Sequence, residues 1–343
     1  MSTPAARTPH RLSPVVLAAA VTAALALTSC SGPDENARSS AGSSSHASPA
    51  AQGVIDLKSA KAAVDAYEKT NIKANAKQDA ALLATVEDGM AYVQDRAHYE
   101  QWKTWSAADR KQYASPFRYT HRTYLIPKSG TGASSWFAMT ATTSDPSHQR
   151  GLFVFDKRDG RYKLVAAVWA SYKLPIPDVA VDGHGLATAV DPAARVGALT
   201  PDAVGAAVTD LDVSGGKREG SRLTSTPASK QAVKEYTDRN SGEDGTWRTA
   251  NFFSIKVAHP QVYALRTTDG GALVLAPHAF KIEFLHKRFM HGGTIVPGKQ
   301  EAIYNSAHRP VVTDDYQGQA LVALPLTGKA RLITRDVQMV DSR

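Results

Sequence analysis

The chain has 343 residues, a single cysteine and a formal net charge of +8. One cysteine excludes an intramolecular disulfide and a zinc site built on several cysteines, so apolar cores must stabilise the folded part. A mildly basic charge without a concentrated basic motif also argues against nucleic-acid binding.

The first element in the chain is an export signal. Residues 1–11 are basic without an acidic residue, and Val15 to Leu27 is apolar except for Thr22. This run is too short to span a bilayer, but it suits the apolar region of a secretory signal. Residues 1–29 are therefore predicted to be a signal peptide.

A cysteine motif follows the signal directly. The motif consists of a branched residue, two small residues and the cysteine, at Leu27, Thr28, Ser29 and Cys30. This order of residues resembles the lipobox of bacterial lipoproteins. In that family the thiol is alkylated with diacylglycerol, and the signal is removed before it. The resemblance implies that Cys30 attaches membrane lipid and holds the protein on the outer face of the cytoplasmic membrane, where several acyl chains bind more stably than one.

The segment after Cys30 is predicted to be a tether. Residues 31–53 are dominated by Ser, Ala, Gly and Pro and contain no aromatic residue, so they cannot bury enough apolar surface to fold. We expect residues 30–53 to be a lipidated cysteine followed by a disordered linker, with an end-to-end distance of ~26 Å.

Helices open the folded part. Leu57 to Val86 is rich in Ala and free of Gly and Pro, which predicts one long helix or two helices broken near residues 71–79. Met90 to Trp105 predicts another helix. Ser106, three residues before an acid, predicts the start of a short one.

Strands follow the helices. Residues 117–126, 135–143, 151–156 and 162–172 are short, rich in aromatic and β-branched residues, and separated by turn residues. Asp159 and Gly160 predict a hairpin between the last two. Helices followed by such a meander indicate an α+β domain with an antiparallel sheet.

The second half repeats this plan in reduced form. Three segments of the second half are similar to segments of the first, in the same order. Residues 232–236 match 63–67, residues 262–268 match 136–143, and residues 328–333 match 160–165. A stretch rich in Pro and Gly separates the halves. We therefore predict a first domain at 54–180, a connection at 181–227 and a second, reduced α+β domain at 228–343.

This plan of helices before a curved sheet resembles the NTF2-like (cystatin-like) fold. The whole chain is similar to actinobacterial secreted lipoproteins of unassigned function. The resemblance implies two tandem α+β domains, in which helices pack on a curved antiparallel sheet. Domains of this fold serve as enzymes, binding pockets and interaction modules, so the fold alone does not assign an activity.

Motifs of common catalytic and metal sites are absent from the sequence, including Gly-x-Ser-x-Gly and His-Glu-x-x-His. The richest polar cluster is His278 to His291. If it is a strand, His278 and His286 share a face with three apolar residues and Glu283 lies on the opposite face. We therefore expect a basic, partly exposed strand end, with no metal site and no cofactor.

Aromatic residues supply the candidates for a ligand pocket. In a cone-shaped fold, the mouth of the cavity is expected to involve Tyr67, Tyr92, Tyr99, Trp102 and Tyr119. Burial in the core is the competing interpretation, because aromatic side chains bury large areas. Arg118, Thr120 and Arg122 alternate along one strand and either meet an anionic ligand or form its solvated face.

Three functions remain open. We favour a non-enzymatic module of the cell envelope that binds a small ligand, a cell-wall polymer or an envelope protein. A pocket enzyme of isomerase or hydrolase type is the alternative, with Asp65, Asp95 and His98 as generic candidates. The third is a structural assembly subunit.

Overall fold

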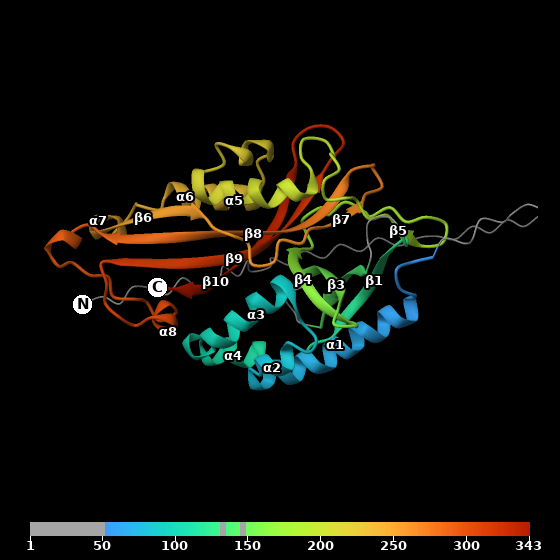
Figure 1. Cartoon of the computed structure of the whole chain (residues 1–343), viewed down its shortest axis with the longest axis horizontal. Coiled ribbons are helices and arrows are strands. Elements are labelled where there is room, and N and C mark those ends of the chain that lie inside the picture. Colours follow the sequence, from blue (N-terminus) through green and yellow to red (C-terminus); the bar gives the residue numbers. More distant parts are fainter. Residues whose placement is uncertain (1–51, 131–134, 145–148) are drawn as a thin grey trace, which may run out of the picture. The chain divides into compact units, whose positions relative to one another are not determined.

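The computed structural model describes residues 52–130, 135–144 and 149–343, and it shows a mixed α+β fold with two open, mainly antiparallel sheets (Figure 1). The predicted signal peptide, the lipobox at residues 27–30 and the linker up to residue 51 lie outside these residues. No helix of the described part is long and apolar enough to cross a membrane.

Helices and strands alternate in groups along the chain. The helices are α1 (Leu57–Lys77), α2 (Ala80–Leu83), α3 (Gly89–Gln101), α4 (Ala107–Tyr113), α5 (Val204–Ser214), α6 (Pro227–Thr237), α7 (Asp244–Trp247) and α8 (Glu301–Tyr304). The 3-10 turns are η1 (Trp102–Thr104), η2 (Pro201–Ala203), η3 (Glu219–Arg222) and η4 (Phe289–His291). The strands are β1 (Tyr119–Pro127), β2 (Trp136–Thr143), β3 (Gln149–Arg158), β4 (Arg161–Ser171), β5 (Leu186–Ala187), β6 (Arg248–Ser254), β7 (Tyr263–Arg266), β8 (Ala272–His286), β9 (Val311–Leu324) and β10 (Arg331–Ser342).

Local signals in the first half are confirmed. The break between α1 and α2 falls at Gln78, whose φ of 52° ends the helix in a left-handed conformation. Ser106 caps α4 by accepting a hydrogen bond from the Asp109 N–H at 3.1 Å. Asp159 and Gly160 both have positive φ, at 51° and 78°, as a tight turn between antiparallel strands requires.

The two sheets share a plan. The first has the order β4-β3-β2-β1-β5, and the second has the order β10-β9-β8-β6, with β7 also paired to β8. At one edge of each sheet, three strands that are consecutive in the sequence pair antiparallel: β4, β3 and β2 in the first, and β10, β9 and β8 in the second. The similarity between residues 262–268 and residues 136–143 does not reflect equivalent positions in the two sheets. Strand β7 lies at an edge beside β8, whereas β2 lies inside its sheet.

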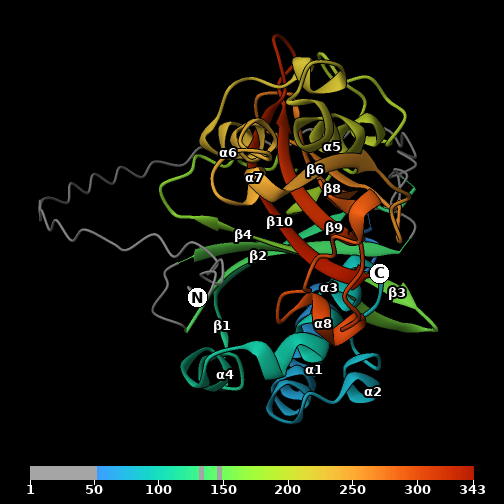
Figure 2. The ribbon, with the colours of Figure 1, turned by 90° about the vertical axis from the view of Figure 1, so that its left-hand side faces the viewer.

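The sheets pack face to face between two layers of helices (Figure 2). Their shared core combines side chains such as Leu152 and Val154 of β3 with Leu273 and Leu275 of β8. The outer face of the first sheet packs against α1, and that of the second against α5 and α6. This order explains why Ala272 to Phe280 is buried continuously, since both faces of β8 are covered there.

The described residues belong to one compact unit, Pro49–Arg343. The expected connection at 181–227 is not an open linker, because it contributes apolar side chains to the core under α5. They are Val190, Val196, Leu199, Val204, Ala207, Val208, Leu211 and Leu223. The division into domains at 54–180 and 228–343 stays a prediction.

A buried ion pair fixes the outer helices to the second sheet. Arg335 of β10 donates two hydrogen bonds to the Asp212 carboxylate of α5, at 2.6 and 2.7 Å, and a third to Glu235 of α6 at 2.8 Å. The Asp212 side chain is completely buried. Burial raises the pKa of Asp212 to about 6, although the guanidinium of Arg335 acts in the opposite direction.

Candidate functional site

The predicted pocket aromatics divide between two packing regions: Tyr67 and Tyr119 lie between α1 and the first sheet, whereas Tyr92 and Tyr99 pack among the helices. Tyr67 and Tyr119 are buried and stacked, with ring centroids 6.2 Å apart. The hydroxyl of Tyr99 donates to Asn75 Oδ1 at 2.6 Å, and that of Tyr92 lies 3.5 Å from the Ala80 carbonyl.

Trp102, the fifth candidate, packs at 5.7 Å from Trp105 and 5.9 Å from Tyr113. None of the five lines either of the two cavities described below.

A polar network crosses the same helices and centres on Glu87, which the sequence did not single out. The Glu87 Oε1 atom accepts hydrogen bonds from the Tyr67 hydroxyl at 2.9 Å and from Asn71 Nδ2 at 3.1 Å. Asn75 Nδ2 in turn donates to Asn71 Oδ1 at 2.8 Å. Burial raises the pKa of Glu87 well above its usual range, and the nearby Asp95 carboxyl raises it further. Burial and the Asp95 carboxyl therefore both favour the neutral form of Glu87 over the charged form.

His98 and Asp95 form the accessible end of this network. His98 Nδ1 lies 3.2 Å from Asp95 Oδ1, and about a quarter of each side chain is exposed, at 25% and 27%. Burial by itself would lower the pKa of His98, but Asp95 and then Asp336 outweigh it and raise that pKa. The arrangement favours the positively charged imidazolium beside the Asp95 carboxylate, and the pair has the residue types of a proton-transfer site.

The other residues named from the sequence lie apart from this network. Asp65 is largely exposed and pairs with Arg122 at 2.6 Å, and Arg122 also contacts Glu68 at 2.7 Å. Arg122 is thus engaged by α1, while Arg118 is exposed and Thr120 bonds to Thr142. Among the earlier enzyme candidates, the structure brings together Asp95 and His98 but not Asp65.

The polar stretch at the end of β8 is a strand, as expected. His278, however, is fully buried, and its ring nitrogens have no hydrogen-bond partner among the described residues. Burial lowers the pKa of His278 to about 3, so this ring is neutral. The expectation of partial exposure therefore fits His286 and His291 but is wrong for His278. The described part contains no group of three His, Cys, Asp or Glu side chains placed to hold a metal ion.

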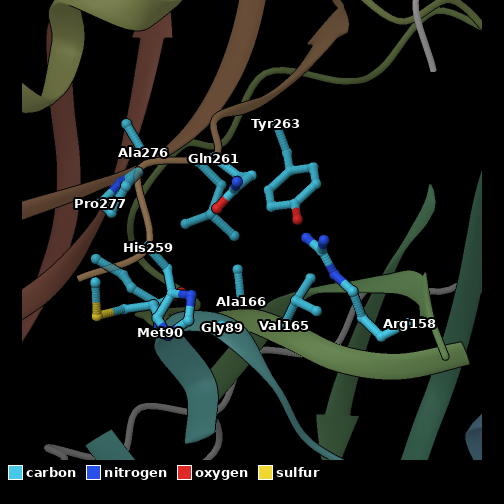
Figure 3. A pocket seen from close by; sticks show the side chains of 12 residues that line it. Gly89, Met90, Arg158, Val165, Ala166, His259, Gln261, Tyr263, Ala276 and Pro277 are labelled. Atoms are coloured by element: carbon cyan, nitrogen blue, oxygen red, sulfur yellow. The ribbon is translucent and has the colours of Figure 1, made fainter. Parts of the chain in front are cut away.

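A small cavity lies between the two sheets (Figure 3). Its volume is about 10 Å³, which is room for one water molecule. The hydroxyl of Tyr263 points toward the guanidinium of Arg158 across it (Figure 3), and Arg158 pairs with Asp156 at 3.0 Å. The space is therefore too small for an organic ligand.

An open cleft of about 500 Å³ lies where a turn of the second sheet faces the hairpin between β9 and β10. Its lining is Pro177, Thr224, Thr267, Asp269, Ala272, Ala323, Leu324, Pro325, Thr327, Gly328, Lys329 and Arg331. Asp269 accepts hydrogen bonds from Thr267 Oγ1 at 2.5 Å and from the Gly271 N–H at 3.1 Å, which lower its pKa.

Two basic side chains border the same cleft. Lys329 is exposed, Arg331 is half-buried, and neither forms an ion pair within the part of the chain that the structure describes. The cleft thus offers hydroxyl groups and two available cations beside one internally bonded carboxylate. Its volume falls within the range of ~300–1,000 Å³ that is usual for ligand sites.

Comparison with known proteins gives a family but not an activity. The sequence profile of a family described as a domain of unknown function, DUF8094, matches residues 51–343. An uncharacterized lipoprotein of Streptomyces coelicolor is 34% identical over 281 residues, which cover 79% of this chain and 77% of the relative. No solved structure matches the chain.

Proposed function

This chain belongs to the DUF8094 family, and we propose that it is a lipid-anchored protein of the cell envelope that binds an anionic, hydroxyl-rich ligand in its open cleft. A lipoprotein relative supports membrane attachment, and Cys30 is the residue that would carry the lipid. Attachment at this position would place the folded part on the outer face of the cytoplasmic membrane.

The observation that carries the binding role is the contrast between the two cavities. The smaller one has room for one water, whereas the cleft has the volume of a ligand site and is bordered by Lys329 and Arg331. Guanidinium and ammonium groups without a carboxylate partner favour phosphate or carboxylate groups, and threonine hydroxyls favour sugar hydroxyls. A segment of an anionic cell-wall polymer has both features.

Replacing Lys329 and Arg331 together by Ala is expected to weaken binding of a purified anionic wall polymer about 100-fold, because each lost charge-assisted hydrogen bond costs ~1.5 kcal/mol. Binding of the lipidated protein in detergent would be measured by calorimetry at low and high salt. The matched control replaces Lys58 and Arg161, two exposed cations on α1 and β4, by Ala and should bind normally. Equal binding of a neutral polysaccharide, or unchanged binding by the cleft variant, would refute the assignment.

A proton-transfer enzyme is the second candidate, and the Asp95 and His98 pair with its buried partner Glu87 favours it. His98 is accessible and has a raised pKa, as a general acid requires. Turnover in a panel of chromogenic aryl esters and glycosides, lost on Asp95→Asn with the fold intact by circular dichroism, would support this function. If no substrate of the panel is turned over and the protein binds the polymer, the ligand-binding function of the cleft is favoured over the enzyme.

We interpret the two halves of the chain as two diverged units of the NTF2-like plan. In each half a helical segment precedes the sheet and packs on its outer face, as α1 does in the first and α5 and α6 do in the second. The matching order of the last three strands supports two tandem, diverged α+β units. Under this proposal the second unit supplies most of the cleft lining, at the end where β9 turns into β10, and Pro177 and Thr224 complete it.

A further inference from the structure

Exposed apolar side chains gather in the excursion between β8 and β9, residues 287–309, which we call the tip. Phe289, Met290, Val296 and Ile303 are 44%, 78%, 65% and 38% exposed. They are four of the nine large apolar side chains that are exposed in the described residues. Such a concentration marks an interaction surface, because single exposed apolar residues are normally scattered.

The tip is a folded element. Ile295 is 2% exposed, and its backbone pairs with Arg309 through hydrogen bonds of 2.8 and 3.3 Å. The Tyr304 hydroxyl accepts a hydrogen bond from Gln101 Nε2 of α3 at 3.1 Å. The surrounding backbone therefore fixes the exposed side chains in place, so exposing them does not require the segment to unfold.

The charge of the tip is positive. The segment contains four basic residues and one acidic residue, Glu301. The basic residues are Lys287, Arg288, Lys299 and Arg309. Arg288 and Lys299 are exposed, and their side chains form no ion pair within the described ranges. Two cations are thus available beside the apolar side chains.

The neighbouring helix α7 adds an aromatic residue. The Lys287 N–H donates to the Trp247 carbonyl at 2.8 Å, and the Trp247 ring lies 5.8 Å from His286. Of the two acids there, Asp244 is paired with Arg248 at 2.5 Å and Glu243 is exposed. Acids of other elements also lie beside the tip, since Asp314 interacts with Arg309, and Glu100 and Asp341 lie near Tyr304. Arg288 and Lys299 still form no ion pair among the described residues, and a half-buried Trp borders the tip as at membrane interfaces.

We propose that the tip docks onto the anionic surface of the membrane that holds the lipid anchor. Phe289 and Met290 enter the boundary between headgroups and acyl chains, and Arg288 and Lys299 contact the headgroups. An anionic polymer would neutralise the cations but leave the apolar side chains in water, whereas a bilayer interface accommodates both. Acyl chains and a basic patch together attach a protein to a membrane more stably than either of them does alone.

The tip lies apart from the start of α1. In Figure 1 the described chain enters α1 at the right, and β8 runs toward the tip at the left. The proposed contact is therefore a second attachment point, on a different part of the described surface from the start of α1. The proposal goes beyond ligand binding in the cleft and uses only the lipid anchor from the proposed function.

The test uses the mature lipidated protein in phosphatidylcholine vesicles with and without phosphatidylglycerol. With Cys30 blocked by lipid, Met290→Cys provides a single thiol for an environment-sensitive dye. We expect the emission to shift to shorter wavelength only with the anionic lipid. The same dye on Leu326→Cys, an exposed position on the hairpin between β9 and β10, should not shift.

Charge reversal at Arg288 and Lys299, both to Glu, is expected to lower the ratio of docked to undocked tip about 25-fold or more, since each basic residue near an anionic surface contributes about fivefold. Reversal of the exposed cations Lys103 and Arg161 is the matched control and should leave the ratio unchanged. Circular dichroism would verify that each variant is folded.

Four results would overturn the docking. They are no dye shift with anionic lipid, an equal shift in neutral vesicles, a shift without vesicles that grows with protein concentration, and a shift caused by an anionic polymer alone. The third would indicate a second copy of the chain as the partner, and the fourth a polymer. Dye labelling of the unsubstituted protein would reveal a free Cys30 and so contradict the anchor separately from the tip.

Discussion

Replacing Arg335 by Met is expected to lower the free energy of unfolding by about 3–5 kcal/mol, which is the usual cost of leaving one charge of a buried ion pair without its partner. The Asp212 carboxylate is completely buried and receives two hydrogen bonds from this guanidinium. Its pKa is already raised to about 6 by burial, and loss of Arg335 would raise it further. Urea unfolding followed by circular dichroism measures the effect.

The loss should depend on pH. A carboxyl group whose pKa is raised in the folded state binds a proton more tightly there than in the unfolded chain, so stability falls as pH rises from the unfolded pKa to the folded one. The Arg335→Met defect should therefore be larger at pH 8 than at pH 5. Adding Asp212→Leu should recover most of the lost stability.

Arg343→Met serves as the exposed control, because Arg343 is 55% exposed and pairs with Asp315 and Asp341 at the surface. Its loss should cost less than about 1 kcal/mol. A similar loss for Arg335 and Arg343 at both pH values would contradict a structural role of the buried pair.

Replacing Cys30 by Ser is expected to abolish lipid incorporation and to release the protein from the lipidated fraction, because the chain contains no other thiol. Metabolic labelling with a radioactive fatty acid and detergent phase partition measure both effects. Ser29→Ala keeps a small residue before the cysteine and should be lipidated normally. Continued labelling of the Cys30→Ser variant would disprove the anchor assignment.

Short-range chemistry made much of the first half predictable. The serine cap of α4 and the Asp159 and Gly160 turn depend on residues a few positions apart, so their signals are complete within a short window. The end of β8 was also predicted to be a strand, because the apolar residues Phe280, Ile282 and Phe284 alternate with charged residues there. Such local features determine where helices, strands and turns form, and these were predicted better than the way in which the helices and strands pack together.

Long-range packing explains what was missed. Residues 190–223 lack a regular apolar period, yet Val196 and Leu199 are buried because the second sheet covers irregular backbone there. His278 was correctly expected on a strand, but it was expected to be partly exposed and is fully buried. Its partner in the β9 register is Gly318, where an added Cβ would lie only 2.6 Å from the ring, so the ring fills space left by that glycine.

The candidate sites were hidden for a related reason. Lys329 and Arg331 follow a hairpin, and Thr267 and Asp269 belong to a turn about sixty residues earlier, so each group alone is typical of a solvent-exposed loop. Glu87 precedes a helix cap and had no periodic pattern around it. The aromatic candidates stay a prediction as pocket residues. In the described residues Tyr67 packs against Tyr119 of the first sheet, whereas Tyr92 and Tyr99 pack among helices.

The length of the β8 and β9 ladder determines how the protein would bear load. The two strands are paired continuously from Ala272 with Leu324 to Leu285 with Val311. Tension applied at the tip would pull both strands in the same direction, because the tip connects the end of β8 to the start of β9. The β8 and β9 pair would therefore move as one unit, and the load would fall on its two edges, where β6 pairs with β8 and β10 pairs with β9.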